Sequence, residues 1–280
     1  MATLLALFSS LLWGTADFHG GKLSKTHPAI AVLGVTQAIG LVFGVVLVLA
    51  SGDFSANAFG ENGYFIPGAL AGILGYCGLI CLYAGLSTGR MGVVAPISGL
   101  SALIPVAYAY FVKGDRLSII LSIGAALAIV GAFLASGPEM SQGLPMKPSI
   151  LALGAAAGFG TSLVFMAIGS QGSALMTMVM MRATTFLVSL AIFAKYRTLG
   201  GLTFKNAPIL IFIGCADFLA NLLLGIATTK GNLTLAMVLG SLYPVVTALL
   251  AFKFLHERLH RIQYLGIFAA VVGVAIISAF

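Results

Sequence analysis

Long apolar runs recur along the whole chain of 280 residues, and they set the strongest limit on how it folds. Each run has about 18 to 24 residues, enough for an α-helix to cross a hydrocarbon core of about 30 Å. Only 8% of the residues are charged, whereas a soluble domain carries about 25%. Because so few charges could not cover a water-exposed surface, the sequence predicts an all-α, polytopic membrane protein.

Turn residues and charges divide the apolar runs into ten expected transmembrane helices. The first five are expected at 2–20, 28–50, 64–87, 91–112 and 117–136, and the second five at 149–169, 174–194, 206–229, 233–254 and 260–280. The first run lacks a basic segment and a clear cleavage site, so we expect a retained helix there rather than a signal peptide. A polar stretch near the centre predicts a five-helix unit at 1–137, a linker at 138–148 and a second unit at 149–280.

The two halves resemble each other at four places in the same order. Residues 6–15 match 152–161, 84–92 match 224–232, 101–106 match 240–245, and 114–117 match 256–259. These matches set Arg90 opposite Lys230 and Pro105 opposite Pro244. A repeated unit with an odd number of helices enters the membrane from the opposite face. We therefore expect two inverted five-helix repeats, a design that exposes one central site to either side in turn.

The repeats, the GDRL and HERL segments after each proline, and the glycine-rich helices that follow resemble the drug/metabolite transporter superfamily, and its EamA-type transporters in particular. The resemblance covers essentially the whole chain. It implies transport of amino acids, sugars, nucleotide sugars or other metabolites. The sequence departs from a strict repeat at one point, because Asp115 follows Pro105 by 10 residues whereas Glu257 follows Pro244 by 13. The ninth helix is therefore expected to end differently from the fourth.

The basic residues give the chain a net charge of +7, and most of them lie in short loops. This placement favours lipid headgroups over nucleic acid as their partner. Loops after odd-numbered helices carry ten Lys and Arg residues, and loops after even-numbered helices carry three. The positive-inside rule then predicts both termini outside, whereas the resemblance implies both termini inside. Both orientations stay open at this point.

Two charged residues deep in apolar runs are the main candidates for function. Arg182 shares a helical stripe with Met178, Thr185 and Ser189, and Asp217 shares one with Asn221 and Thr228. At about 1.5 Å per residue, both charges lie about 12 to 13 Å from the same face of the membrane. Because charge at this depth is costly, we expect the two to pair. The pair either only locks the two helices together or also lines a substrate path, where Arg182 meets an anionic group and Asp217 a cation or a proton.

Other polar side chains are candidates with two interpretations each. Asp17, with Trp13 and Ser10 on its helix face, is expected nearer a membrane boundary, as a capping or interfacial residue or as a coupling residue. Tyr76 and Tyr83 form a stripe that serves either packing or a binding wall.

Three prolines interrupt expected helices. Pro96, Pro105 and Pro244 remove backbone hydrogen bonds, which is tolerated where the freed groups meet protein or a water-filled cavity. Ser101 and Tyr243 lie close to these positions in the sequence. The prolines are therefore either ordinary packing kinks or the border of a pathway.

The sequence contains no Walker motif, dinucleotide fingerprint, H-E-x-x-H motif or plausible nucleophilic triad. Cys77, Cys81 and Cys215 lie inside apolar runs and are expected to pack as small residues rather than bind a metal. The resemblance implies export of amino acids or related metabolites. We therefore expect a secondary active transporter in the plasma membrane that exports small polar metabolites such as amino acids by alternating access, without metal or cofactor. The alternative is an integral-membrane enzyme or lipid-handling protein without transport activity. The expected partners are a small-molecule substrate and the lipid bilayer but no nucleic acid, and the oligomeric state is open.

Overall fold

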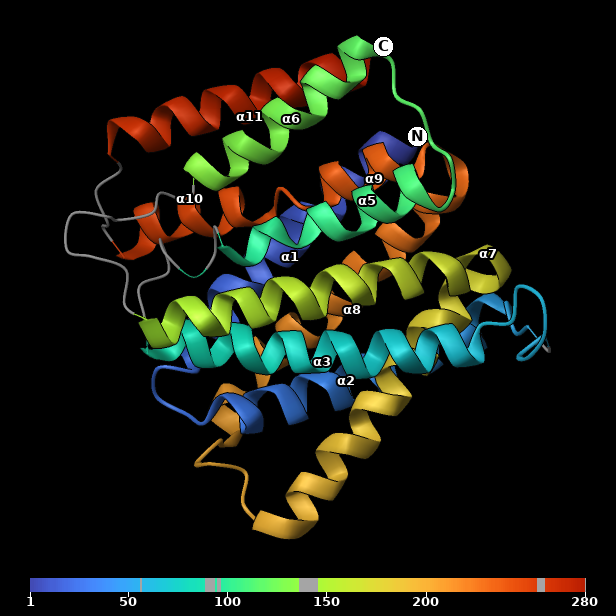
Figure 1. The fold of residues 1–280 in the computed structure, drawn as a ribbon. Helices are drawn as coiled ribbons and strands as arrows, with labels where there is room; N and C mark the ends of the chain where they lie inside the picture. Colours follow the sequence, from blue (N-terminus) through green and yellow to red (C-terminus); the bar gives the residue numbers. More distant parts are fainter. Residues whose placement is uncertain (56, 89–93, 95–96, 136–145, 256–259, 280) are drawn as a thin grey trace.

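A computed structural model describes the chain except for residues 56, 89–93, 95–96, 136–145, 256–259 and 280, and the described part is helical, without strands (Figure 1). Its helices are α1 (Ala2–Leu23), α2 (Ala29–Ser51), α3 (Phe65–Thr88), the 3₁₀ turn η1 (Leu100–Ala102), α5 (Leu103–Phe111), α6 (Ile119–Ala135), α7 (Met146–Tyr196), the 3₁₀ turn η3 (Phe204–Asn206), α8 (Ala207–Lys230), α9 (Leu233–Gly240), α10 (Tyr243–Leu255) and α11 (Arg261–Ala279). The all-α expectation is confirmed.

Several of these helices have the length and apolarity needed to cross a membrane. In the described part of the chain they are Ala29–Ser51, Phe65–Thr88, Met146–Tyr196, Phe204–Lys230 and the stretch Leu233–Phe254. Ile97–Phe111, Ile119–Leu134 and Arg261–Gly273 are shorter apolar helices. Helix α1 covers the first expected span, but polar residues make up a larger share of it than of these helices. The multi-pass architecture follows from these lengths, whereas the expected number of ten membrane crossings is not established by them.

The helix breaks fall at or near the positions that the sequence marks. Helix α7 covers the sixth and seventh expected spans, and it is interrupted at Ser173, where the backbone is extended (φ −160°, ψ 112°). The ninth expected span is divided into α9 and α10, with Pro244 as the second residue of α10. Pro105 is the third residue of α5, directly after η1. Proline suits the first turn of a helix because the N–H groups there have no partner in the helix. Pro96 lies outside the described residues.

The packing of the helices repeats itself between the two halves. Helix α1 packs along α8, and α3 packs along the first segment of α7, residues 146–172, where Gly78 lies against Phe159. In the repeat, α1 corresponds to the first segment of α7, and α3 corresponds to α8. The pair formed by α1 and α8 is therefore equivalent to the pair formed by the first segment of α7 and α3. Helices α6 and α11, the last of each half, pack against each other and form one side of the molecule in Figure 1. This is the pattern of contacts that a twofold relation between two repeats produces.

Helix α1 reaches the centre of the molecule through a close crossing with α10 at Gly14. A Cβ added to Gly14 would lie 2.6 Å from the backbone oxygen of Tyr243 and would also collide with Val246. At the same crossing, the Thr247 hydroxyl donates to the backbone oxygen of Gly14 over 3.1 Å. Because residue 14 has no side chain, α1 and α10 can approach closely enough for this hydrogen bond to form.

We expect Gly14→Ala to lower the midpoint of thermal unfolding in detergent, because forcing a methyl group into a packed contact costs about 1 to 3 kcal/mol. Gly34→Ala is the matched control. A Cβ there would have its nearest neighbour at 3.7 Å, on Ser189. Both changes add the same methyl group to a helix interior. Equal midpoints for the two variants would contradict the close crossing.

Candidate functional site

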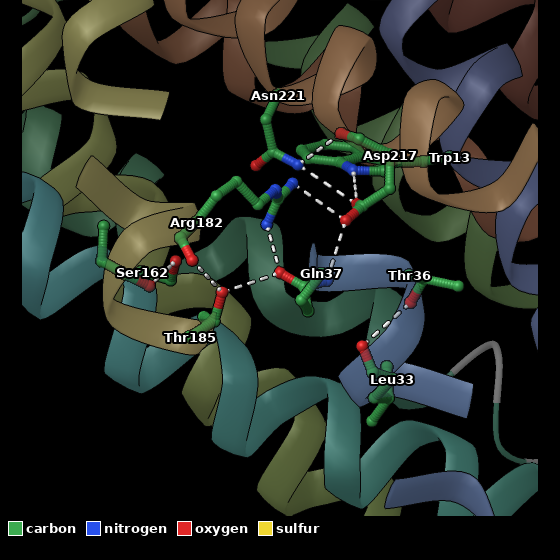
Figure 2. Close-up of polar contacts among 10 residues, drawn as sticks. Trp13, Leu33, Thr36, Gln37, Ser162, Arg182, Thr185, Asp217 and Asn221 are labelled. Carbon is green, nitrogen blue, oxygen red and sulfur yellow. Dashed lines mark hydrogen bonds and ion pairs between the residues drawn. The ribbon is translucent and has the colours of Figure 1, made fainter. Parts of the chain in front are cut away.

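A buried ion pair lies at the centre of the molecule, between the second segment of α7, residues 174–196, and α8. Arg182 Nη2 lies 2.9 Å from Asp217 Oδ2, and the two side chains are 4% and 13% exposed (Figure 2). The structure thus brings together the two charges that the sequence places at one depth. Thr185 and Asn221 lie one turn further along α7 and α8, and both are buried.

Gln37 of α2 bridges the two charged side chains. Its amide oxygen accepts from Arg182 Nη1 over 2.8 Å and from the Thr185 hydroxyl over 3.1 Å, and its amide nitrogen donates to Asp217 Oδ2 over 3.3 Å. Gln37 is only 2% exposed. The amide oxygen of Gln37 thus faces the positive charge of Arg182, and its amide nitrogen faces the negative charge of Asp217. In this way Gln37 links α2 to both α7 and α8 (Figure 2).

Asp217 also receives donors from α1 and from its own helix. The indole nitrogen of Trp13 donates to Oδ1 over 3.0 Å, and the Asn221 amide donates to the same oxygen over 3.2 Å. Asn221 further donates to the backbone oxygen of Asp217 over 2.7 Å. Both carboxylate oxygens of Asp217 are thus hydrogen-bonded or ion-paired, as a buried polar group requires. The donors come from both halves of the chain.

A cavity of about 60 Å³ adjoins the ion pair. A single water molecule needs about 10 to 15 Å³ on this scale, so the space admits a few waters or part of a small molecule. Its polar lining comes from both halves and includes Asp17, Tyr76, Ser101, Tyr243, Ser162 and Asn221, together with Arg182, Thr185 and Asp217. The site combines charges of both signs with hydroxyls, an amide and aromatic rings, so it is suited to a small polar molecule.

Hydroxyl contacts hold the aromatic side chains of the cavity wall. Tyr76 and Ser189 share a hydrogen bond of 2.7 Å between their hydroxyls. Tyr243 donates to the Ser98 hydroxyl over 3.3 Å, and its ring meets that of Trp13 edge to face, with centroids 6.1 Å apart. Tyr76 and Tyr243 therefore line the cavity in defined positions.

Some of the expected residues lie elsewhere than the sequence indicates. Asp17 is buried, with 8% exposure, and it lines the cavity rather than lying at a boundary. Tyr83 is buried outside the cavity lining, with its hydroxyl against Gly20 of α1. Pro105 and Pro244 are buried but do not line the cavity. Thr228 is also buried, and its hydroxyl donates to the Gly225 backbone oxygen.

Gln37 and the role of Trp13 were not predicted from the sequence. A single amide inside the 23-residue apolar run of α2 is the signal that could have identified Gln37, because a buried amide needs partners. Trp13 was expected on the face of Asp17, but nothing in its own helix indicates that its partner is Asp217. Within the described residues, no group of His, Cys, Asp and Glu is arranged to hold a metal ion.

The fold and the site together define a class: multi-pass helical membrane proteins with a charged cavity between two repeats. Comparison with known proteins specifies this further, because the sequence model of the EamA-like transporter family matches residues 1–137 and again residues 146–279. The chain belongs to the EamA-like transporter family, and so to the drug/metabolite transporter superfamily. Members of this family are transporters rather than enzymes.

A solved structure has a fold similar to that of this chain. A solved structure described as "Crystal structure of protein" is similar with a TM-score of 0.79 and 18% sequence identity, covering 99% of this chain and 96% of that one. At this identity the likeness concerns the fold alone. No curated protein sequence matches the chain.

Proposed function

We propose that this protein is a secondary active transporter that exports a small polar metabolite, such as an amino acid, across the plasma membrane. The observation that carries the proposal is the charged cavity beside Arg182 and Asp217, which is lined by side chains of both repeats. A polar site this deep in an apolar bundle is costly, so charge in such a place marks a substrate or ion pathway. Membership in the EamA-like family supports transport.

The repeats supply a mechanism for moving the cargo. Two units related by a twofold axis in the membrane plane can adopt each other's conformations, which opens the site between them first to one side and then to the other. The ion pair belongs to α7 and α8 of the second repeat, and Gln37 and Trp13 reach it from the first. Rocking of one repeat against the other would therefore rearrange the contacts around Asp217, and cargo groups are positioned to replace them.

Transport is tested by counterflow into vesicles. Full-length protein is first screened with amino acids and related metabolites by thermal shift, since a compound that binds only the folded state stabilises it. Vesicles containing the protein and preloaded with an unlabelled hit are then given the labelled compound outside. We expect labelled uptake above that of protein-free vesicles.

Asn221→Ala should reduce this uptake by about five- to thirtyfold, because the Asn221 amide lines the cavity and a lost polar contact costs about 1 to 2 kcal/mol. Thr229→Ala is the control on the same helix, as Thr229 is exposed and its hydroxyl returns to the backbone of Ile226. A folded protein that binds a metabolite but gives no counterflow in any vesicle would argue against transport. Equal uptake by both variants would place the cargo elsewhere.

A further inference from the structure

The charges that line the cavity do not balance. Two carboxylates, Asp17 and Asp217, face one guanidinium, that of Arg182. Arg182 is ion-paired with Asp217. Within the part of the chain that the structure describes, Asp17 forms no ion pair. With both carboxylates ionised, the site carries one negative charge in excess.

An excess charge of this kind needs a counter-charge. Asp17 is 8% exposed, and an ionised carboxylate removed from water is strongly disfavoured unless a proton or a cation neutralises it. The donors around the ion pair, Gln37, Trp13 and Asn221, are directed to Asp217 rather than to Asp17. Among the residues that the structure describes, none supplies this counter-charge to Asp17, which leaves a proton or a cation from outside the protein.

The repeat shows that this carboxylate is not required for packing. Asp17 follows Thr15 by two residues, as Leu163 follows Thr161 at the matching place of the second repeat. Leu163 lines the same cavity and is equally buried, at 8% exposure. An apolar side chain thus fills the equivalent position of the fold, which leaves the charge of Asp17 to be explained by a ligand.

A second polar group in the cavity also lacks a full partner. The Ser101 hydroxyl is 1% exposed, lines the cavity, and lies near the Tyr243 hydroxyl without forming a hydrogen bond of ordinary geometry. The rings of Trp13 and Tyr243 line the same space. A carboxylate, a hydroxyl oxygen without a partner and aromatic faces together are the groups that bind an ammonium ion.

We propose that Asp17 is the binding site for one monovalent cation in the cavity, namely the ammonium group of an amine cargo or a coupling ion that takes the same place. The inference deepens the proposed function, and rests on it for the movement of the cation, but binding itself is independent of transport. A sodium ion and a proton are the two forms that a coupling ion would take here.

The surroundings of Asp17 determine how binding depends on pH. Asp217 of α8, Tyr83 of α3 and Tyr243 of α10 interact electrostatically with it, Arg182 of α7 lines the same cavity, and His19 and Lys22 follow on its own helix. Histidine can titrate in the same pH range as a buried carboxylate. A variant that removes only the Asp17 charge is therefore needed to assign any pH effect.

The test uses the purified full chain in detergent and follows the midpoint of thermal unfolding. Wild type, Asp17→Asn and Asp17→Leu are compared with added ethylammonium chloride, with sodium chloride, and across a pH series. Asp17→Leu copies the residue of the second repeat, so it is expected to fold. Asp53→Asn removes an exposed carboxylate and should behave as wild type.

We expect ethylammonium to raise the midpoint of the wild type by several degrees and to leave both Asp17 variants unchanged, which would identify an amine cargo. Stabilisation by sodium alone, absent from the variants, would identify a sodium-coupled site. A pH dependence present only in wild type, without a cation effect, would identify a proton site. All three results support a single positive charge at Asp17.

Identical responses of wild type and Asp17→Leu to ethylammonium, sodium and pH would overturn the inference. Failure of Asp17→Leu to fold would also overturn it, because the carboxylate would then be structural. Cation binding without counterflow would contradict the transport proposal and leave the cation site standing. Counterflow with identical cation responses would do the reverse.

Discussion

Replacing either member of the Arg182–Asp217 pair with alanine is expected to destabilise the folded protein by about 3 to 5 kcal/mol, because the remaining partner becomes an unpaired buried charge. Arg182 is 4% exposed, Asp217 is 13% exposed, and Arg182 Nη2 lies 2.9 Å from Asp217 Oδ2, so the group that remains would lose its charged partner in a buried place. The measurement is the yield of folded protein and its thermal midpoint in detergent. Lys205→Ala, which removes an exposed cation, is the control and should have no such effect.

Two further variants separate a structural role of the pair from a role in transport. The double alanine variant removes both charges, and Arg182→Asp with Asp217→Arg exchanges them. If the pair only holds α7 and α8 together, both variants should recover folding and counterflow. If the pair also contacts the cargo, folding should return while counterflow stays lost. Wild-type stability in both single alanine variants would contradict the pairing itself.

The depth of the charged pair in the membrane could be predicted from the sequence. Arg182 and Asp217 stand out because they interrupt apolar runs, and the rise per residue of a helix is constant, so counting residues places both at one depth. That they belong to adjacent antiparallel helices follows from the order of the runs. Both steps use local information alone.

Contacts between distant helices were not predictable in the same way. Trp13 donates to Asp217 across 204 positions of sequence, and Gln37 contacts Arg182 across 145. Whether α1 and α2 approach α8 and α7 depends on which helix faces pack, and apolar faces of similar composition do not specify this. The same reason explains Asp17, whose position along α1 indicated a boundary, whereas the close crossing of α1 and α10 at Gly14 brings it into the interior.

The position of Gln37 requires an amide side chain, because its oxygen contacts Arg182 and its nitrogen contacts Asp217. Gln37→Leu keeps the approximate volume but removes the acceptor for Arg182 Nη1 and the Thr185 hydroxyl and the donor to Asp217 Oδ2. Leaving a buried polar group without its partner costs about 1 to 3 kcal/mol, and more when the group is charged. We therefore expect a clear fall in the thermal midpoint together with weakened counterflow.

Thr36→Val tests whether this loss is specific to the bridge. Thr36 is the neighbour of Gln37 on α2 and is equally buried, at 2% exposure, but its hydroxyl donates only to the Leu33 backbone oxygen of its own helix, over 3.1 Å. Removal of the Thr36 hydroxyl should change the thermal midpoint little.

Gln37→Glu adds a further distinction, since it keeps an acceptor for Arg182 but sets a second carboxylate against Asp217, where the Gln37 nitrogen now lies 3.3 Å from Oδ2. If the bridge organises the pair, Gln37→Glu should lose counterflow more strongly at high pH, where its carboxylate is ionised, than at low pH, where a protonated Glu can donate as the amide does. Counterflow of Gln37→Leu and Gln37→Glu equal to that of Thr36→Val at every pH would show that Arg182 and Asp217 hold their positions without Gln37.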